Sequence, residues 1–315
     1  MVQIQILMGV YEGTAHLKAQ LQSLVSQDHS NWNLHISDDS STKTSWQMID
    51  KFFTTQSQTD DQTGVSNSPY VKITQGPCAG FAANYIHMIR AFGDGFVALA
   101  DQDDIWHPDK LSRAIAALAD IPADVPALYC ARSIYWDGRN KKRLSAPFRR
   151  APSFSNALIE NIAQGNTVVL NPAATRLARA AAAQIKDVFA HDWWLYALIS
   201  GAGGRIISDN GAGVLLYRQH RKNLIGSGQG IKAQIIRKGQ VLRGKLTERL
   251  NQNDAALQAC YSYLTPENKE RHRQFVLARK STLPQRITGL YRLGIYRQHP
   301  LGTLGFRGAS FLGRA

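Results

Sequence analysis

The sequence lacks the features that mark several large classes of protein. Its 315 residues contain no run of about 18 apolar residues, so no transmembrane helix is expected. Its three cysteines (Cys78, Cys130 and Cys260) are scattered and odd in number, which predicts neither a disulfide framework nor a thiolate metal site. It has no GxxxxGK[ST] loop and no GxGxxG fingerprint, which weakens a phosphoryl-transfer interpretation. The first residues lack the basic segment and cleavage site of a signal peptide, so the cytoplasm is the expected compartment.

Acidic residues are scarce in the last third of the chain. Residues 218–315 hold 19 Lys and Arg against 4 Asp and Glu, whereas residues 1–217 hold 18 against 19. Such asymmetry is typical of a region that meets nucleic acid or an anionic membrane. No zinc spacing or RNA-binding motif accompanies it, so we expect no nucleic acid partner. Apolar residues alternate with the basic ones, which suits an interfacial helical tail on anionic lipid. Helices packed on the rest of the protein, with basic outer faces, are an equally weighted alternative.

Strand and helix patterns alternate along the first two-thirds of the chain. Strands are expected at 2–8, 33–37, 71–74, 96–100, 128–131, 167–170, 205–208 and 214–217. Helices are expected at 17–25 with Thr14 as cap, at 44–53, 81–92 and 172–185, after Pro108, from 191, and from about 228 onward. Residues 54–69 and the basic stretch 137–150 are expected to be loops. The alternation predicts an α/β fold with right-handed crossovers and a mostly parallel sheet.

Acidic clusters follow two of these strands. Asp101-Gln102-Asp103-Asp104 comes directly after an apolar strand, where ligands bind in open α/β sheets. Three carboxylates this close repel one another unless a cation or a turn compensates, and Mg²⁺ prefers oxygen ligands. A solvated turn with a helix cap is an equally weighted alternative. Asp38-Asp39 follows an earlier strand, where a carboxylate can accept hydrogen bonds from a ribose or base, although an Asx-turn explains the pair as well.

Two later segments complete the pattern. His191-Asp192-Trp193-Trp194 begins a predicted helix, where Asp192 is a candidate general base and the tryptophan faces can stack on sugar rings. Taken alone, a helix-start carboxylate with core tryptophans is the favoured alternative. The segment Tyr217–Asn223 is rich in cations: Arg218 can neutralise a diphosphate and His220 can reach a metal, or the segment is a solvated basic loop.

In their order, these residues resemble the family-2 glycosyltransferases with the GT-A fold, and bacterial polysaccharide-assembly members often called rhamnosyltransferases most of all. The similarity spans roughly residues 2–225. It implies a GT-A domain over 1–225, with a donor half at about 1–107 and an acceptor half at about 108–225. A basic, mostly helical region, 226–315, would follow.

The resemblance also implies roles for single residues. The donor would meet Gly9, Tyr11, Asp39, Asn84, Asp101 and Arg218. Asp101 and Asp103 match the Asp-x-Asp motif that binds Mg²⁺ or Mn²⁺, and Asp103 is the expected direct ligand. Asp192 matches the catalytic base of inverting members. Asn166, Trp193 and Trp194 would border the acceptor.

The implied activity is transfer of a sugar, with inversion, from a dTDP- or UDP-sugar. The acceptor would be a hydroxyl of a glycan or a lipid-linked glycan in bacterial surface polysaccharide synthesis. A non-catalytic nucleotide-sugar or glycan-binding protein of the same fold is the alternative. The presence of both the acidic motif and Asp192 argues against it.

Overall fold

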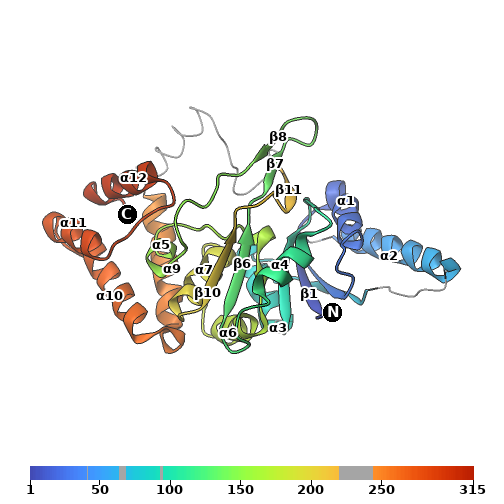
Figure 1. The fold of residues 1–315 in the computed structure, drawn as a ribbon, viewed down its shortest axis with the longest axis horizontal. Helices are drawn as coiled ribbons and strands as arrows, with labels where there is room; N and C mark the ends of the chain where they lie inside the picture. The colour runs from blue at the N-terminus through green and yellow to red at the C-terminus, as the bar shows by residue number, and fades with distance from the viewer. Residues whose placement is uncertain (41, 64–68, 93–94, 220–243) are drawn as a thin grey trace.

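Two β-sheets organise the first two-thirds of the chain in this computed structural model, which describes all residues except 41, 64–68, 93–94 and 220–243 (Figure 1). The larger sheet has the spatial order β10 (Arg205–Asp209), β6 (Ala127–Ala131), β9 (Val169–Leu170), β4 (Phe96–Asp101), β1 (Ile4–Val10), β2 (Trp32–Asp38) and β3 (Val71–Gln75). The smaller sheet has the order β5 (Ile105–Trp106), β11 (Leu215–Arg218), β7 (Ile134–Trp136) and β8 (Lys142–Leu144).

Most strand pairs of the larger sheet are parallel, as predicted. Strands β4, β1, β2 and β3 run in one direction, and β6 and β10 are parallel to each other. The exception is β9, which is antiparallel to both of its neighbours. Strands β1, β2 and β4 are parallel, and Gly9 of β1 pairs with Ser37 of β2 and with Asp101 of β4. The carboxyl ends of the three strands therefore meet at one edge of the sheet. The segments that follow these strands are therefore neighbours in space.

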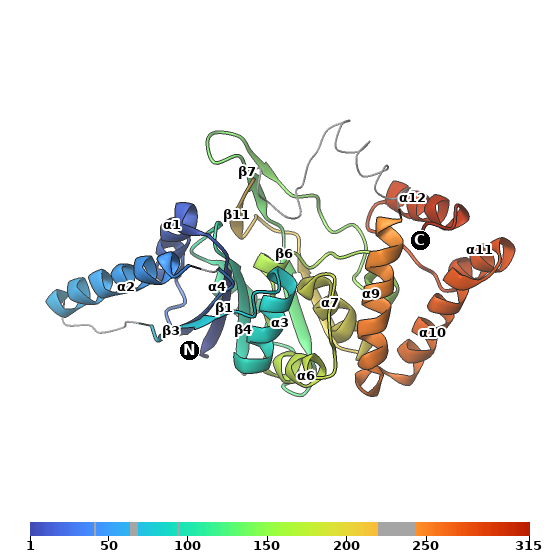
Figure 2. The ribbon, with the colours of Figure 1, turned by 180° about the vertical axis from the view of Figure 1, so that it is seen from behind.

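Helices cover both faces of the larger sheet, as the two opposite views show (Figures 1 and 2). These helices are α1 (Thr14–Val25), α2 (Thr44–Thr63), α3 (Phe81–Phe92), α4 (Lys110–Leu118), α5 (Phe154–Ala157), α6 (Pro172–Ala182) and α7 (His191–Gly201). Side chains alternate between the faces of a strand, so Leu7 packs in the core with α3, α6 and α7. Its neighbours Ile6 and Met8 pack in the other core, with α1, α2 and α4.

Several predicted boundaries were wrong. Thr14 is the first residue of α1 and not its cap, because Gly13 holds the cap position without a side-chain hydrogen bond. Helix α2 continues to Thr63, so most of the expected loop 54–69 is helical. Pro108 precedes the cap residue of α4, Asp109, and so lies outside the first turn. The expected loop 137–150 contains the short strand β8. Thr167, the expected first residue of a strand at 167–170, instead ends a 3-10 turn, η1 (Gly165–Thr167), and the strand β9 begins at Val169.

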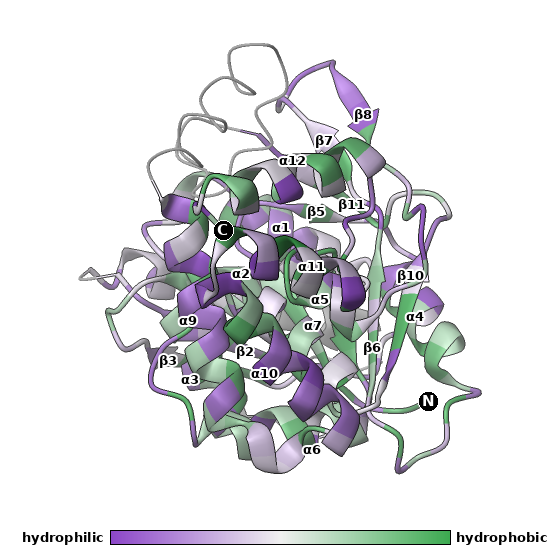
Figure 3. Ribbon diagram, turned by 90° about the vertical axis from the view of Figure 1, so that its left-hand side faces the viewer, coloured by the Kyte–Doolittle hydropathy of each residue, from purple (hydrophilic) through white to green (hydrophobic). Residues whose placement is uncertain are grey.

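The C-terminal region is helical, as predicted, over the part that the structure describes. Its helices are α9 (Lys245–Ala259), α10 (Pro266–Lys280), α11 (Leu283–Arg292) and α12 (Pro300–Phe311), with a 3-10 turn, η2 (Tyr261–Tyr263), between the first two (Figure 3). Phe275, Leu290 and Phe306 lie in the same core as Leu7. The helices therefore pack on the sheet domain through their inner faces. Residues 226–243 lie outside the described residues, and the boundary at 225 stays a prediction.

Candidate active site

The acidic loop, Asp101–Asp104, begins where β4 ends and is fixed by hydrogen bonds from two distant segments. Asp104 is completely buried, and its Oδ2 accepts a hydrogen bond of 2.5 Å from Nδ2 of Asn166 in η1. Its Oδ1 accepts a bond of 3.4 Å from the backbone N–H of Arg218 at the end of β11. The Nε of Arg218 donates in turn to the carbonyl oxygen of Asp103 at 3.0 Å. Segments 62 and 114 residues away thus set the position of this loop.

Burial and mutual repulsion disfavour the ionised forms of the carboxyl groups in the acidic loop. Burial, followed by the nearby charge of Asp103, raises the pKa of Asp101 to about 7. Burial, together with the nearby charges of Asp101 and Asp103, raises the pKa of Asp104 well above its usual range. The buried Lys110 lies against the ring of Trp106, with Nζ 2.9 Å from the ring centroid, and burial holds the pKa of its ammonium well below the usual value. The site therefore favours an added cation.

The acidic loop fits a hard divalent cation that keeps open positions. Asp101 and Asp103 supply carboxylate oxygens, the ligands that Mg²⁺ and Mn²⁺ prefer, and Mg²⁺ is usually held by one or two carboxylates plus phosphate and water oxygens. Among the described residues no group of three or more His, Cys, Asp or Glu side chains is arranged to enclose a metal. His220, the other predicted ligand, lies outside the described residues, so its role stays a prediction.

Tyr85 on α3 links the acidic loop to the start of α7. Its Oη lies 2.5 Å from the carbonyl oxygen of Ala100 and 2.9 Å from Oδ1 of Asp101. Its ring stacks on the imidazole of His191, with centroids 3.9 Å apart. Gly9 on β1 leaves room for this ring, since a Cβ at Gly9 would lie 3.2 Å from Cε2 of Tyr85. Sequence reasoning missed Tyr85, although it directly follows Asn84.

Asp192 lies in the first turn of α7 and is held by two backbone N–H groups. Oδ2 accepts a bond of 3.0 Å from Gly165, and Oδ1 accepts one of 2.7 Å from Trp193. Burial raises the pKa of Asp192 to about 6, and these bonds with one from Asn161 limit the rise. The residue after Gly165, Asn166, bonds Asp104, so one turn joins the candidate base to the acidic loop, and the charge of Asp192 also raises the pKa of Asp101. A carboxylate with this pKa is ionised at neutral pH yet basic enough to accept a proton.

The two tryptophans after Asp192 do not face an acceptor, and that expectation was wrong. Trp193 is 7% exposed and Trp194 is 2% exposed, and both lie in the core beneath α7. Nε1 of Trp193 donates to the carbonyl oxygen of Ala157 at 2.6 Å. Asn166 is 1% exposed with its amide nitrogen bonded to Asp104, so it positions the acidic loop and does not present that group to an acceptor.

Asp39 orders the loop that follows β3, and Asn84 ties α3 to β2. Oδ1 of Asp39 accepts a bond of 2.6 Å from the N–H of Cys78, and Oδ2 accepts one of 2.9 Å from Gly80. The amide of Asn84 is paired with Ser37, accepting from Oγ at 2.5 Å and donating to the carbonyl oxygen at 2.9 Å. Cys78 has a φ of +54°, so this loop holds a non-glycine residue in the left-handed region. The donor roles of Asp39 and Asn84 stay predictions.

The Asx-turn expected at Asp38-Asp39 is present at Asp38, whose Oδ1 accepts a bond of 2.9 Å from the N–H of Ser40.

Gln102 ties the end of β1 to the acidic loop. Its amide bonds the backbone of Tyr11 on both sides, at 2.8 Å to the N–H and at 3.0 Å to the carbonyl oxygen. The Tyr11 side chain is 61% exposed at this edge of the sheet, which leaves its ring accessible to a ligand.

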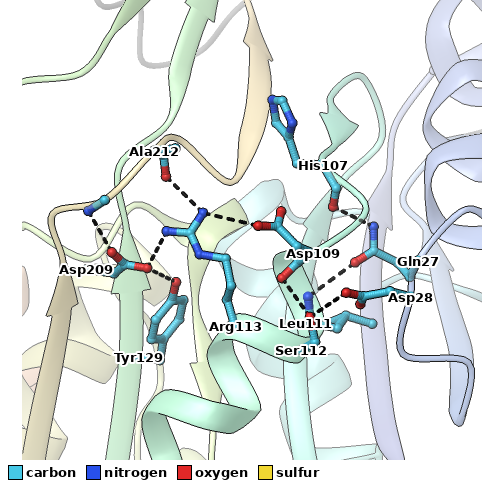
Figure 4. A network of polar contacts seen from close by, with 11 residues as sticks. Gln27, Asp28, His107, Asp109, Leu111, Ser112, Arg113, Tyr129, Asp209 and Ala212 are labelled. Atoms are coloured by element: carbon cyan, nitrogen blue, oxygen red, sulfur yellow. Dashed lines mark hydrogen bonds and ion pairs between the residues drawn. The ribbon is translucent and has the colours of Figure 1, made fainter.

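A polar network behind the acidic loop anchors α4 (Figure 4). Arg113 donates to Oδ2 of Asp209 at 2.6 Å and to the carbonyl oxygen of Ala212 at 3.0 Å. Tyr129 donates to the same Asp209 oxygen at 2.7 Å. On the other side, Nε2 of Gln27 donates to the carbonyl oxygen of His107 at 2.8 Å. These bonds attach α4 to β10 and to the segment that follows it, and they attach the residue after β5 to the segment after α1.

Comparisons with known proteins agree with this arrangement. The dTDP-rhamnosyl transferase RfbG of Shigella flexneri is 26% identical over 243 residues, which cover 74% of this chain and 78% of that protein. Protein CgeD of Bacillus subtilis is 22% identical over 162 residues, covering 51% of this chain and 35% of that protein.

Solved structures share the fold. S. aureus TarS 1-349 in complex with UDP-GlcNAc has a TM-score of 0.52 at 14% identity, covering 99% of this chain and 89% of that one. The mannosyltransferase PcManGT of Pyrobaculum calidifontis, in complex with GDP-Man and Mn²⁺, has a TM-score of 0.51 at 16% identity, covering 99% and 85%. The family model described as Glycosyl transferase family 2 matches residues 6–184, more than half of the chain. The chain therefore belongs to glycosyltransferase family 2 and has the GT-A fold.

Proposed function

We propose that this glycosyltransferase is an inverting enzyme that moves a sugar from a nucleotide-diphosphate donor to a hydroxyl of a glycan or lipid-linked glycan. The observation that carries the proposal is the closeness of Asp192 to the acidic loop. Adjacent residues of η1 join the two: the N–H of Gly165 donates to Asp192, and the side chain of Asn166 donates to Asp104. The charge of Asp192 also raises the pKa of Asp101. A proton acceptor beside a diphosphate-binding loop is the pairing that sugar transfer from such a donor requires.

The donor half of the site is assigned to the carboxyl ends of β1, β2 and β4. Asp103 and Asp101 would hold Mg²⁺ or Mn²⁺, which when bound supplies a Lewis acid for the charge of the leaving diphosphate. The exposed ring of Tyr11 and the loop ordered by Asp39 would take the nucleoside. The guanidinium of Arg218, beside the Asp103 backbone, would contact the diphosphate.

The acceptor chemistry is assigned to Asp192. Its carboxylate would take the proton from the acceptor hydroxyl as that oxygen attacks the anomeric carbon. Attack from the face opposite the diphosphate inverts the configuration. Tyr85 would keep Asp101 in place while its ring supports His191, the residue before the base. Burial holds the pKa of His191 at about 3, so its imidazole stays neutral beside the base.

The donor class is inferred from relatives, so it is part of the proposal. The similarity to a dTDP-rhamnosyl transferase favours a dTDP-deoxyhexose, with a UDP-sugar as the other candidate. We infer a role in bacterial surface polysaccharide synthesis, in the cytoplasm and at the inner face of its membrane. The free state of all three cysteines suits a reducing compartment. Among the described residues no helix is long and apolar enough to cross a membrane.

Thermal stabilisation by a panel of nucleotide sugars tests the donor half of the proposal. Each sugar is added with and without Mn²⁺, to the wild-type protein and to Asp103→Ala. We expect one nucleotide class to raise the melting temperature only when Mn²⁺ is present, and Asp103→Ala to remove that effect. Stabilisation that is equal with and without Mn²⁺, or unchanged in Asp103→Ala, would contradict the assignment of the acidic loop.

A further inference from the structure

The last two helices carry a second apolar face that the fold does not use. Their inner residues Leu290 and Phe306 are buried in the core. On the outside, six large apolar side chains are 45% to 72% exposed: Ile287, Tyr291, Leu301, Leu304, Phe311 and Leu312. Figure 3 views this end of the molecule, with hydrophobic residues on α11 and α12. A gathering of this kind on one surface marks an interaction site more often than scattered apolar residues do.

The charge around this face has one sign. Residues 281–315 contain five arginines and no aspartate or glutamate. The arginines are Arg286, Arg292, Arg297, Arg307 and Arg314. An apolar face bordered by arginine complements a surface that is apolar inside and anionic outside, which describes a bilayer of anionic phospholipid. A second copy of this chain would bring arginines against arginines and is disfavoured by the same charges.

A hollow beside these residues has the chemistry for a phosphate group. It encloses about 360 Å³ and is lined by Arg150 and Arg307 together with Tyr291, Tyr296 and Thr303. Cζ of Arg150 lies 3.6 Å from the ring centroid of Tyr296, and Cζ of Arg307 lies 5.7 Å from that of Tyr291. The lining contains no acidic side chain. Guanidinium groups held on aromatic rings suit the oxygens of a phosphate.

We propose that α11 and α12 form the surface by which this protein docks on an anionic phospholipid membrane. The exposed apolar side chains insert among the acyl chains, and Arg150 and Arg307 meet lipid phosphates. In Figures 1 and 2, α12 and the smaller sheet both lie in the upper part of the view, the side toward which β1 runs from the N-terminus. The purpose, bringing a lipid-linked acceptor to the site, rests on the proposed function, but the binding itself needs neither donor nor metal.

Co-sedimentation of the full chain with vesicles tests the proposal. Vesicles of phosphatidylcholine alone are compared with vesicles that also contain phosphatidylglycerol, without donor or metal. The test variant is Leu301→Ser with Leu304→Ser, and the control is Val25→Ser with Tyr70→Ser, which removes exposed apolar groups elsewhere. We expect the wild type and the control to bind anionic vesicles at least about tenfold more tightly than the test variant, because two apolar side chains no longer insert.

Several outcomes would overturn the proposal: no binding of the wild type to anionic vesicles, equal binding of all three proteins, or release of the bound protein by millimolar inorganic phosphate. A change from dimer to monomer in the test variant by light scattering would instead assign the surface to a second copy. Donor turnover is measured separately on the same protein preparations, with donor and metal added. If the wild type binds vesicles but shows no turnover, the result counts against the proposed function alone. Turnover in the test variant shows that this variant is folded.

Discussion

Replacing Asp192 by asparagine should make the enzyme slower and should remove a loss of stability that grows as the pH rises. Burial raises the pKa of this carboxyl from 3.8 to about 6. The folded protein therefore binds the proton more tightly than the unfolded chain does, and ionisation disfavours the fold. The stability associated with Asp192 is fully present below pH 3.8 and is lost as the pH rises through 6. Asparagine resembles the neutral acid and does not titrate, so it avoids this loss.

The magnitude follows from the two pKa values. They differ by about two pH units, and each unit corresponds to about 1.4 kcal/mol, so the ionised carboxylate costs about 3 kcal/mol at pH 7. Roughly 2 kcal/mol of this appears between pH 4.5 and pH 7.5. We expect the free energy of unfolding of Asp192→Asn, relative to wild type, to rise by that amount over this interval. Urea unfolding at the two pH values measures it, and steric effects of the substitution cancel in the comparison.

The same variant should lose about 10²- to 10⁴-fold in turnover, the usual contribution of a general base. In the wild type, turnover should rise with pH and level off above about pH 6. Asp209→Asn is the matched control. Although burial opposes it, hydrogen bonds from Tyr129, Gly211 and Arg113 lower the pKa of Asp209, so its stabilisation is present above pH 3.8 and is lost at low pH. This control should lose stability at neutral pH and keep its turnover.

The reasoning is refuted by either of two results. Near-full turnover in Asp192→Asn would remove the base assignment. A stability difference that does not change between pH 4.5 and pH 7.5 would show that the carboxyl is not desolvated as its burial indicates.

Three other changes test neighbouring groups. Tyr85→Phe removes the hydroxyl bonded to Asp101 but keeps the ring stacked on His191. Because that bond lowers the pKa of Asp101, the variant should need more Mn²⁺ for half-maximal turnover, and a higher pH should restore the wild-type requirement. An unchanged Mn²⁺ titration would exclude this link between Tyr85 and metal binding. Lys110→Met replaces a buried amine that has no hydrogen-bond partner among the described residues, so its urea midpoint should correspond to equal stability or a gain of about 1 kcal/mol, and a loss above about 2 kcal/mol would contradict this. Removal of divalent metal by a chelator should abolish turnover, and added Mn²⁺ or Mg²⁺ should restore it; full turnover after chelation would exclude the metal.

Local sequence patterns were sufficient for the elements that line the donor edge. The apolar run Phe96–Ala100 predicted a strand buried on both faces, and Val97–Ala100 are completely or almost completely buried. The helix predicted at residues 81–92 has the bounds of α3. The acidic residues at the end of β4 were predicted from the same local pattern. These patterns depend only on residues that are neighbours in sequence, so they suffice for an element that is determined by its own residues.

Local patterns were insufficient where the site depends on distant partners. Tyr85 meets Asp101 only because β1 and β4 pair in the register that puts Gly9 beside Asp101. The tryptophans were assigned to an acceptor because aromatic residues beside a carboxylate suggest sugar stacking. A signal against this was present: from Trp193 to Ile199 no residue is charged, and a helix that is apolar on all sides is buried on all sides.

The turn η1 explains how one short segment sets both halves of the site. The N–H of Gly165 holds the carboxylate of Asp192, and the next residue, Asn166, holds that of Asp104. A Cβ at Gly165 would lie 2.9 Å from Nε2 of His191, so no larger residue fits without moving the His191 side chain. Burial raises the pKa of both carboxyl groups, and a buried carboxyl group needs a hydrogen-bond donor held in place beside it. The turn η1, which contains Asn166, the residue expected to border the acceptor sugar, therefore holds both Asp192 and the acidic loop in place. A shift of η1 would move both carboxyl groups together.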